Sequence, residues 1–264
     1  MIDWAASINA LTVMLALGGV GWLITLPGKN VNLVDSLWSL FFLAGALIYA
    51  ANLEALGPRA ILVLVLLTLW ALRLSFHLAQ RNRGKPEDHR YRTIRRNNSP
   101  GFAWKSLFIV FGLQAVLAWV VALPLFVAVA GETPLNRLDV LGTGLLLAGL
   151  TLEALADRQL ARFKADPANR GQVMDRGLWR YSRHPNYFGE ACVWWGFWLI
   201  ALATGSGWTT AWTVLSPILM TFLLLNVSGV ALLEKDIAER RPPYRDYVAR
   251  TSAFLPWLPR REVQ

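Results

Sequence analysis

The chain has one cysteine, three histidines and few charged residues, and each scarcity excludes a class of protein. A lone cysteine, Cys192, excludes an intrachain disulfide and any metal cluster held by cysteines. The histidines are scattered and form no His-x-x-x-His or related zinc signature, so we expect no metal. Neither GxGxxG nor a Walker-type glycine loop occurs, so a bound nucleotide would not be held by a Rossmann fold.

Charged residues make up 16% of the 264 residues, whereas a soluble domain usually has about a quarter. Hydrophobic residues make up 55%, and apolar runs near the 20 or so residues that cross a bilayer recur along the chain. We therefore predict an all-α polytopic membrane protein, with one helical domain formed by residues 1–264. The first apolar run has neither a basic n-region nor a small-residue cleavage site, so we expect a retained helix.

The apolar runs predict seven transmembrane helices, with boundaries at 5–26, 33–52, 59–79, 103–130, 138–156, 187–204 and 209–232. Three polar stretches, 80–102, 157–186 and the tail 233–264, hold 21 of the 26 Lys and Arg residues. Seven spans put these stretches on one side of the membrane, which the positive-inside rule makes cytoplasmic. We expect the N-terminus outside, the C-terminus in the cytoplasm, and location in the inner membrane if the source is bacterial. The net charge of +9 then reflects topology, so we expect no nucleic-acid partner.

Five ionisable residues interrupt the predicted spans: Asp35, Arg73, His77, Glu153 and Glu190. Such residues are costly in lipid and normally face the interior of a helix bundle. All five lie toward the predicted cytoplasmic ends, which predicts one polar site that opens to the cytoplasm. Taken singly, each has an alternative explanation: an ion pair between Arg73 and Asp35, or snorkelling of His77 or Glu153 to the interface.

The three polar stretches are rich in residues that can bind phosphates and planar rings. Attraction to lipid headgroups explains basic residues, but not the interleaved Asp, Glu, Asn, His and Tyr. Residues 157–164 are expected to continue the fifth helix into water. The segment MDRGLWRYSRHPN leads into the sixth helix, where Asn186 can act as N-cap and the helix N-terminus attracts anions.

The motif RYSRHPNYFGE, followed by two apolar spans and YRDYVARTSAFLPWLP, resembles the C-terminal region of steroid 5-alpha-reductases. LVDSLWSL, ALRLSFHLAQRNRGKPEDHRY and ALADRQLARFK extend the resemblance over about residues 30–258. It implies a seven-helix membrane reductase that uses NADPH to reduce the 4,5 double bond of a 3-oxo-4-ene steroid or a similar flat lipid. We expect a monomer whose partners are this substrate and membrane lipid.

The resemblance also implies the roles of individual residues. The cofactor contacts that it implies, with the neighbouring His184 included, are Arg73, Asn82, Arg83, Asp157, Lys164, His184, Asn186, Tyr187, Glu190 and Tyr244. Asp35 aligns with the family's second-helix glutamate, although Val34-Asp35 stands where that family has Gln-Glu. A carboxylic acid kept neutral by an apolar site can donate a hydrogen bond to the enone oxygen as enolate charge develops. The family's third-helix tyrosine has no counterpart in residues 60–80, and Tyr91 is the candidate replacement.

Two other functions fit parts of the sequence. Membrane methyltransferases of the isoprenylcysteine carboxyl type have a similar RHPxYxG motif and tail, and they use S-adenosylmethionine. That resemblance is concentrated in the C-terminal half, whereas residues 80–102 and Asp35 favour the reductase. A non-enzymatic lipid-binding or transport protein would also explain buried polar residues, but the chain shows no inverted repeat or broken midplane helix.

Overall fold

The structure is a computed structural model that describes residues 2–205, 207–227, 230, 234 and 242–260. Within these ranges the regular secondary structure is helical throughout, as the composition predicts, and no described residue lies in a β-strand. Contacts divide the chain into two compact units. Unit 1 comprises Met1–Asn136 and Ile200–Thr213, and unit 2 comprises Arg137–Leu199 and Val214–Gln264. The predicted single domain stays a prediction.

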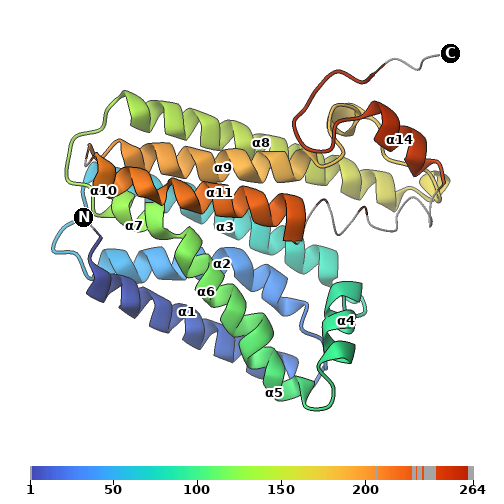
Figure 1. Cartoon of the computed structure of the whole chain (residues 1–264), viewed down its shortest axis with the longest axis horizontal. Helices are drawn as coiled ribbons and strands as arrows, with labels where there is room; N and C mark the ends of the chain where they lie inside the picture. Colours follow the sequence, from blue (N-terminus) through green and yellow to red (C-terminus); the bar gives the residue numbers. More distant parts are fainter. Residues whose placement is uncertain (1, 206, 228–229, 231–233, 235–241, 261–264) are drawn as a thin grey trace. The chain divides into compact units, whose positions relative to one another are not determined.

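Unit 1 is a bundle of helices, all but one of them from the N-terminal part of the chain (Figure 1). Its helices are α1 Trp4–Thr25, α2 Leu33–Ala51, α3 Pro58–Asn82, α4 His89–Asn97, α5 Phe102–Ser106, the π-helical turn Leu107–Gly112, α6 Leu113–Val121, α7 Leu123–Val129 and α10 Trp208–Ala211. Helix α2 is central, because it packs against α1, α3, α6 and α7. Its side chains Phe41, Phe42 and Tyr49 are fully buried, and the Ser39 hydroxyl donates to the Ala71 carbonyl on α3 at 2.8 Å.

Arg59 joins the two stretches of chain that form unit 1. Its side chain is fully buried at the start of α3. The guanidinium donates to the carbonyl oxygens of Thr133 and Pro134, both at 3.0 Å, and of Ala203 at 3.3 Å. Because buried donors are costly unless paired, these bonds hold both loops on the α3 terminus.

The fourth predicted span, 103–130, is divided in the structure. Helix α6 ends at Val121, and α7 begins at Leu123, directly before Pro124. Proline has no N–H and its ring clashes with the carbonyl four residues earlier, so a straight helix cannot continue through it. Every residue of α7 is buried, so this part of the predicted span packs inside unit 1.

Unit 2 holds the long helix α8 and the shorter helices that follow it (Figure 1). Its elements are α8 Arg137–Ala165, 3-10 turns at Pro167–Asn169 and Gly177–Arg180, α9 Pro185–Leu202, α11 Leu215–Phe222, the π-helical turn Leu223–Val227 and α14 Tyr244–Arg250. The 3-10 turn Trp212–Val214 joins α10 to α11. The expectation that residues 157–164 continue the fifth helix is confirmed, because α8 runs to Ala165.

Helices α8 and α9 touch backbone to backbone at Gly149 and Gly189. A Cβ built on Gly189 would lie 2.6 Å from the Gly149 carbonyl oxygen and 2.7 Å from the Glu153 nitrogen. A second contact of the same kind pairs Gly196 with Gly142, seven residues later on α9 and seven residues earlier on α8. Only glycine allows this approach, and close packing through small residues is a common means of association between membrane helices.

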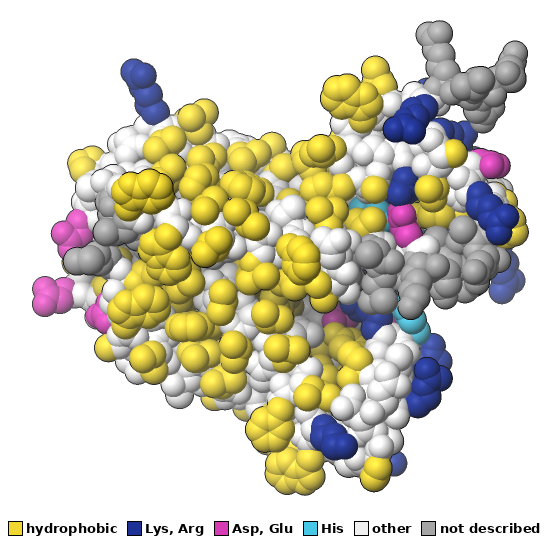
Figure 2. All heavy atoms as spheres, in the orientation of Figure 1, with side chains coloured by type: hydrophobic (Ala, Val, Ile, Leu, Met, Phe, Trp, Pro, Cys, Tyr) yellow, Lys and Arg dark blue, Asp and Glu magenta, His cyan; other side chains and the backbone are white. Residues whose placement is uncertain are grey.

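Five helices among the described residues are long and apolar enough to cross a membrane, which indicates a membrane protein. They are Trp4–Thr25, Leu33–Ala51, Pro58–Asn82, Phe102–Val121 and Arg137–Ala165. Trp4 and Trp22 on α1 are 18 residues apart, or about 27 Å along a helix, close to the thickness of the hydrocarbon core. In Figure 2, apolar side chains dominate the visible face of unit 1, and basic side chains gather around α4.

The sixth and seventh predicted spans correspond to α9 and to the helical segment 208–227, which are not among those five helices. Residues 228–229 and 231–232 of the seventh predicted span lie outside the described residues. Seven spans and the orientation of the termini therefore stay predictions.

Candidate functional site

In unit 1, Asp35 is the centre of a polar cluster in the first turn of α2. The cluster consists of Asp35, Arg81, Arg90, Tyr91 and Gln114, and is called the Asp35 cluster. The Tyr91 hydroxyl donates to Asp35 Oδ1 at 2.6 Å, and Gln114 Nε2 donates to the Tyr91 hydroxyl at 3.2 Å. Arg90 and Arg81 lie 3.3 and 3.6 Å from Asp35 Oδ2. The two residues predicted to be catalytic are therefore in direct contact.

Two guanidinium groups lie against Asp35, although it stands in an apolar helix. Its side chain is 12% exposed, and Arg90 and Arg81 both pair with Oδ2. The prediction expected a hydrogen-bond donor at Asp35, whereas in this structure Asp35 Oδ1 accepts from the Tyr91 hydroxyl. The arginines come from the end of α3 and from α4, so the apolar pattern of the second span did not reveal them.

Tyr91 is the proton-bearing member of the cluster. Burial raises the pKa of Tyr91 well above its usual value, and the adjacent Asp35 charge raises it further. Burial opposes charge on Arg90, but Asp35, Tyr91 and Asp88 together outweigh it and raise the Arg90 pKa. The phenol therefore keeps its proton at neutral pH and can donate one hydrogen bond, while Arg90 stays cationic.

The loop before α4, the helix that carries Tyr91, is tied to the turn between α1 and α2. Asn32 Oδ1 accepts from the Asp88 N–H at 2.8 Å, and Asn32 Nδ2 donates to the Pro86 carbonyl at 3.1 Å. Glu87 accepts from the Val31 N–H at 3.0 Å and from Arg95 at 2.7 and 2.9 Å. Burial opposes ionisation of Glu87, but these hydrogen bonds lower its pKa below the usual value. This network holds the start of α4 beside α2 and so places Tyr91 on Asp35.

In unit 2, Asn186 and Asp157 lie together where α8 and α9 pack. Asn186 Nδ2 donates to Asp157 Oδ1 at 3.1 Å, and Asp157 is only 7% exposed. Asn186 Oδ1 is buried and has no hydrogen-bond partner among the described residues. Helix α9 begins at Pro185, so the predicted N-cap role of Asn186 is wrong: proline occupies the first position, and Asn186 follows inside the first turn. An unpaired buried acceptor is costly, and a bound ligand with an N–H donor would satisfy it.

A second polar cluster of unit 2 surrounds Glu234 and is called the Glu234 cluster. It consists of Arg183, His184, Glu234 and Tyr244. Arg183 binds both carboxylate oxygens at 2.7 and 2.8 Å, His184 Nε2 lies 2.9 Å from Oε1, and the Tyr244 hydroxyl donates at 3.3 Å. Burial opposes ionisation, but the hydrogen bonds from His184 and Arg183 lower the pKa of Glu234 to about 2. The cluster thereby joins Glu234 and Tyr244 of α14 to Arg183 and His184, directly before α9.

Further contacts attach α14 to Trp179 and to Arg183, the first residue of the RHPN motif (residues 183–186). Tyr247 donates to the Trp179 carbonyl, and its side chain is 2% exposed. The Arg183 guanidinium also donates to the carbonyl oxygens of Val248 and Thr251. Burial raises the pKa of Tyr244 above its usual range, and the Glu234 charge raises it further, so this phenol is neutral. Tyr244 and His184 are therefore both held by Glu234, as members of one network.

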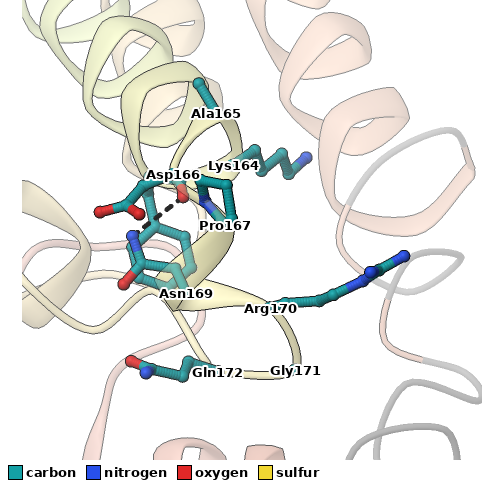
Figure 3. A pocket seen from close by; sticks show the side chains of 9 residues that line it. Lys164, Ala165, Asp166, Pro167, Asn169, Arg170, Gly171 and Gln172 are labelled. Carbon is teal, nitrogen blue, oxygen red and sulfur yellow. Dashed lines mark hydrogen bonds between the residues drawn. The ribbon is translucent and has the colours of Figure 1, made fainter.

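Lys164 lies beside a pocket of about 390 Å³ in the turn after α8 (Figure 3). Asn169 Nδ2 donates to the Phe163 carbonyl at 3.0 Å and closes this turn. The Lys164 and Arg170 side chains extend toward the same side of the turn (Figure 3). Two exposed cations on one small pocket fit an anionic group such as a phosphate.

The remaining predicted site residues lie on α3 and at its end, in unit 1, and on α9, in unit 2. Arg73 is half-buried on α3, Arg83 is exposed at its end, and Asn82 Nδ2 reaches the Asn32 carbonyl at 3.5 Å. Tyr187 stacks on the His184 ring with centroids 5.5 Å apart. Glu190, 5% exposed, accepts from Trp194 Nε1 at 2.9 Å. The prediction that all these residues share one site joins residues of both units and stays a prediction.

Sequence reasoning missed several members of these clusters. Gln114 carries a polar amide inside an apolar run, and this signal could have been read. Arg81 stood in a stretch so rich in arginine that no pattern singled it out. Glu234 was one of several acidic residues in the tail, and its contacts with Arg183, His184 and Tyr244 distinguish it.

The chain belongs to the family described as "Protein of unknown function (DUF1295)", whose model matches residues 21–251. A similar protein is "Uncharacterized protein C594.04c" of Schizosaccharomyces pombe. It is 28% identical over 281 residues, which cover 94% of this chain and 79% of the relative. No solved structure matches the chain. The family match includes Asp35, Tyr91, Asn186 and Glu234.

Proposed function

We propose that the protein is an NADPH-dependent membrane reductase that reduces the 4,5 double bond of 3-oxo-4-ene steroids or of similar enone lipids. The proposal joins the motif resemblance to the chemistry of the two units. The observation that carries it is the 2.6 Å hydrogen bond between Tyr91 and Asp35. This bond places the buried phenol of Tyr91 beside the carboxylate of Asp35 on the second helix. Tyr91 can therefore take the place of the third-helix tyrosine that the resemblance implies and this chain lacks.

Reduction of an enone requires stabilisation of charge on the carbonyl oxygen as a hydride reaches the beta carbon. A preorganised donor at such an oxygen typically contributes a factor of about 10²–10³ to turnover. Tyr91 is a neutral phenol that can turn its hydroxyl from Asp35 to the substrate oxygen. When the phenol turns away, Asp35 still forms ion pairs with Arg90 and Arg81. Tyr91 is thus the proposed donor, and Asp35 positions it.

The residues of unit 2 fit a dinucleotide with amide and phosphate groups. Bound NADPH would supply the hydride. Asn186 Oδ1 is a buried acceptor suited to an N–H donor such as a carboxamide. Lys164 and Arg170 provide cations for a phosphate on the pocket after α8. An S-adenosylmethionine molecule also carries N–H donors but has no phosphate, so these cations favour NADPH.

Binding and turnover by the purified protein test the proposal. We expect saturable binding of NADPH and oxidation of NADPH that depends on an added 3-oxo-4-ene steroid. Saturable binding of S-adenosylmethionine without binding of NADPH would establish the methyltransferase alternative instead. A protein that binds such steroids but consumes neither cofactor would be a lipid-binding or transport protein.

Two variants separate the roles assigned to the clusters. Asp35→Asn should lower turnover far more than NADPH affinity, because it removes the charge that orients Tyr91. Asn186→Ala should raise the dissociation constant of NADPH by about 3- to 10-fold, the worth of about one hydrogen bond. Asn9→Ala is the matched control, since Asn9 is exposed and bonds only to Asn52 in the hydrogen bonds described for it. Equal NADPH affinity in Asn186→Ala and Asn9→Ala would place the cofactor elsewhere.

A further inference from the structure

The segment that follows α14 presents three large apolar side chains to the surroundings. Leu255 is 62% exposed, and Trp257 and Leu258 are each 74% exposed. Scattered apolar residues on a protein surface need no explanation, but three within four residues form a patch. Residues 252–260, which carry this patch, are called the tail segment.

The exposure of these side chains does not come from a loose end of the chain. The Arg183 N–H donates to the Ser252 carbonyl at 2.9 Å, and the Ser182 hydroxyl donates to the Phe254 carbonyl at 2.8 Å. The Trp257 N–H donates to the Tyr181 carbonyl at 2.9 Å. The backbone is therefore fixed along residues 181–183, and it holds the apolar side chains outward.

The tail segment lies at the start of an apolar helix. Phe254 packs edge-on against Phe188 in the first turn of α9, with ring centroids 5.6 Å apart. From Ala191 onward, α9 carries an almost unbroken apolar sequence. The exposed patch is thus held at the point where the chain of unit 2 changes from polar to apolar.

Basic residues border the patch. Arg260 is exposed at its end, and Arg180 is exposed directly before the residues to which the tail segment is bonded. Figure 2 shows basic and apolar side chains side by side around α14. Tryptophan and leucine flanked by arginine are typical of segments that lie in the membrane interface, where the rings sit at headgroup depth.

We infer that the tail segment is an interfacial anchor that inserts Leu255, Trp257 and Leu258 among the lipids of an anionic leaflet. Arg260 and Arg180 then face the headgroup phosphates. A soluble protein partner or a second copy of this chain would not require arginines beside an apolar patch held at the start of an apolar helix. The anchor would keep the RHPN motif at a constant depth, because the two are joined by backbone hydrogen bonds. This inference does not depend on the proposed enzymatic function.

Lipid quenching of a probe at position 258 tests the inference. The protein carries Cys192→Ala and Leu258→Cys, is labelled with nitrobenzoxadiazole, and is placed in nanodiscs that hold one copy with phosphatidylglycerol. Lipids with a spin label at a shallow acyl position should quench this probe at least two-fold more than a probe introduced by Gln172→Cys. Gln172 is the matched control, because it is exposed on the turn after α8 of the same unit. Aqueous iodide should show the reverse order.

Equal quenching at the two positions by iodide, without lipid quenching at 258, would overturn the inference. A probe at 258 that is shielded from both quenchers would also overturn it, because the patch would then be covered by protein. The variant Arg260→Glu tests the role of charge. It should reduce lipid quenching at 258 in phosphatidylglycerol discs and leave it unchanged in phosphatidylcholine discs. Equal reduction in both lipids would refute the electrostatic part.

Discussion

Replacing Gly189 by alanine tests the closest approach of α8 and α9. The added Cβ would lie 2.6 Å from the Gly149 carbonyl oxygen, 2.7 Å from the Glu153 nitrogen and 3.0 Å from the Glu153 Cβ. Ordinary contact begins near 3.4 Å, so the first distance is about 0.8 Å too short. Two of these atoms belong to the α8 backbone, so no side chain can move aside and the helices must separate. Overpacking of this kind typically costs about 1–3 kcal/mol.

The separation of α8 and α9 should also weaken the hydrogen bond between Asn186 and Asp157. Asn186 and Asp157 lie on the same two helices and are 3.1 Å apart, so a shift of about 0.8 Å would take them beyond good hydrogen-bond distance. We expect Gly189→Ala to lower the melting temperature of the detergent-purified protein by several degrees, since 1 kcal/mol corresponds to about 2–4 °C in proteins of 150–250 residues. NADPH affinity should fall with it.

Gly144→Ala is the matched control on α8. A Cβ there meets nothing within 4 Å, and alanine in a helix interior is favoured over glycine by about 0.5–1 kcal/mol. Its melting temperature should therefore equal or exceed that of the parent protein. An unchanged melting temperature in Gly189→Ala, with Gly144→Ala behaving alike, would refute the backbone contact between α8 and α9.

Three further predictions concern the two clusters and the pocket. Tyr91→Phe should lower steroid-dependent turnover by about 10²–10³-fold with little change in NADPH affinity; equal loss in Tyr181→Phe, an exposed tyrosine, would contradict a specific role. Glu234 has a pKa of about 2, below its ordinary 4.5, so its stabilising contribution is present above pH 4.5 and is lost as the pH falls toward 2. The melting temperatures of the parent and Glu234→Gln should therefore differ most near neutral pH and converge in that acidic range; a constant difference would count against the ion pair. Lys164→Ala should weaken NADPH about 3- to 10-fold and NADH less, as measured by equilibrium binding, if the pocket holds the extra phosphate.

The helices of this protein follow from local sequence. Apolar runs about as long as a bilayer is thick predicted α1, α2 and α3 to within a few residues, because turn-forming and charged residues flank each run. The division of the fourth run at Pro124 was also visible in the sequence and was missed. The turn-forming and polar residues of 80–102 and 157–186 predicted correctly where the polar connections lie. They did not predict the short helix α4 within the first connection.

The sequence alone therefore determined where apolar helices form and which polar residues interrupt them. It also marked Asp35 and Tyr91, which are 56 residues apart, but it could not show that they touch. Only the tertiary structure decided that, because the α1–α2 turn and the α3–α4 loop are tied together by Asn32 and Glu87. The ion pairs of Asp35 were likewise decided by tertiary contacts. A carboxylate pairs with the cations within a few ångströms of it, and Arg81 and Arg90 are distant from Asp35 in the chain.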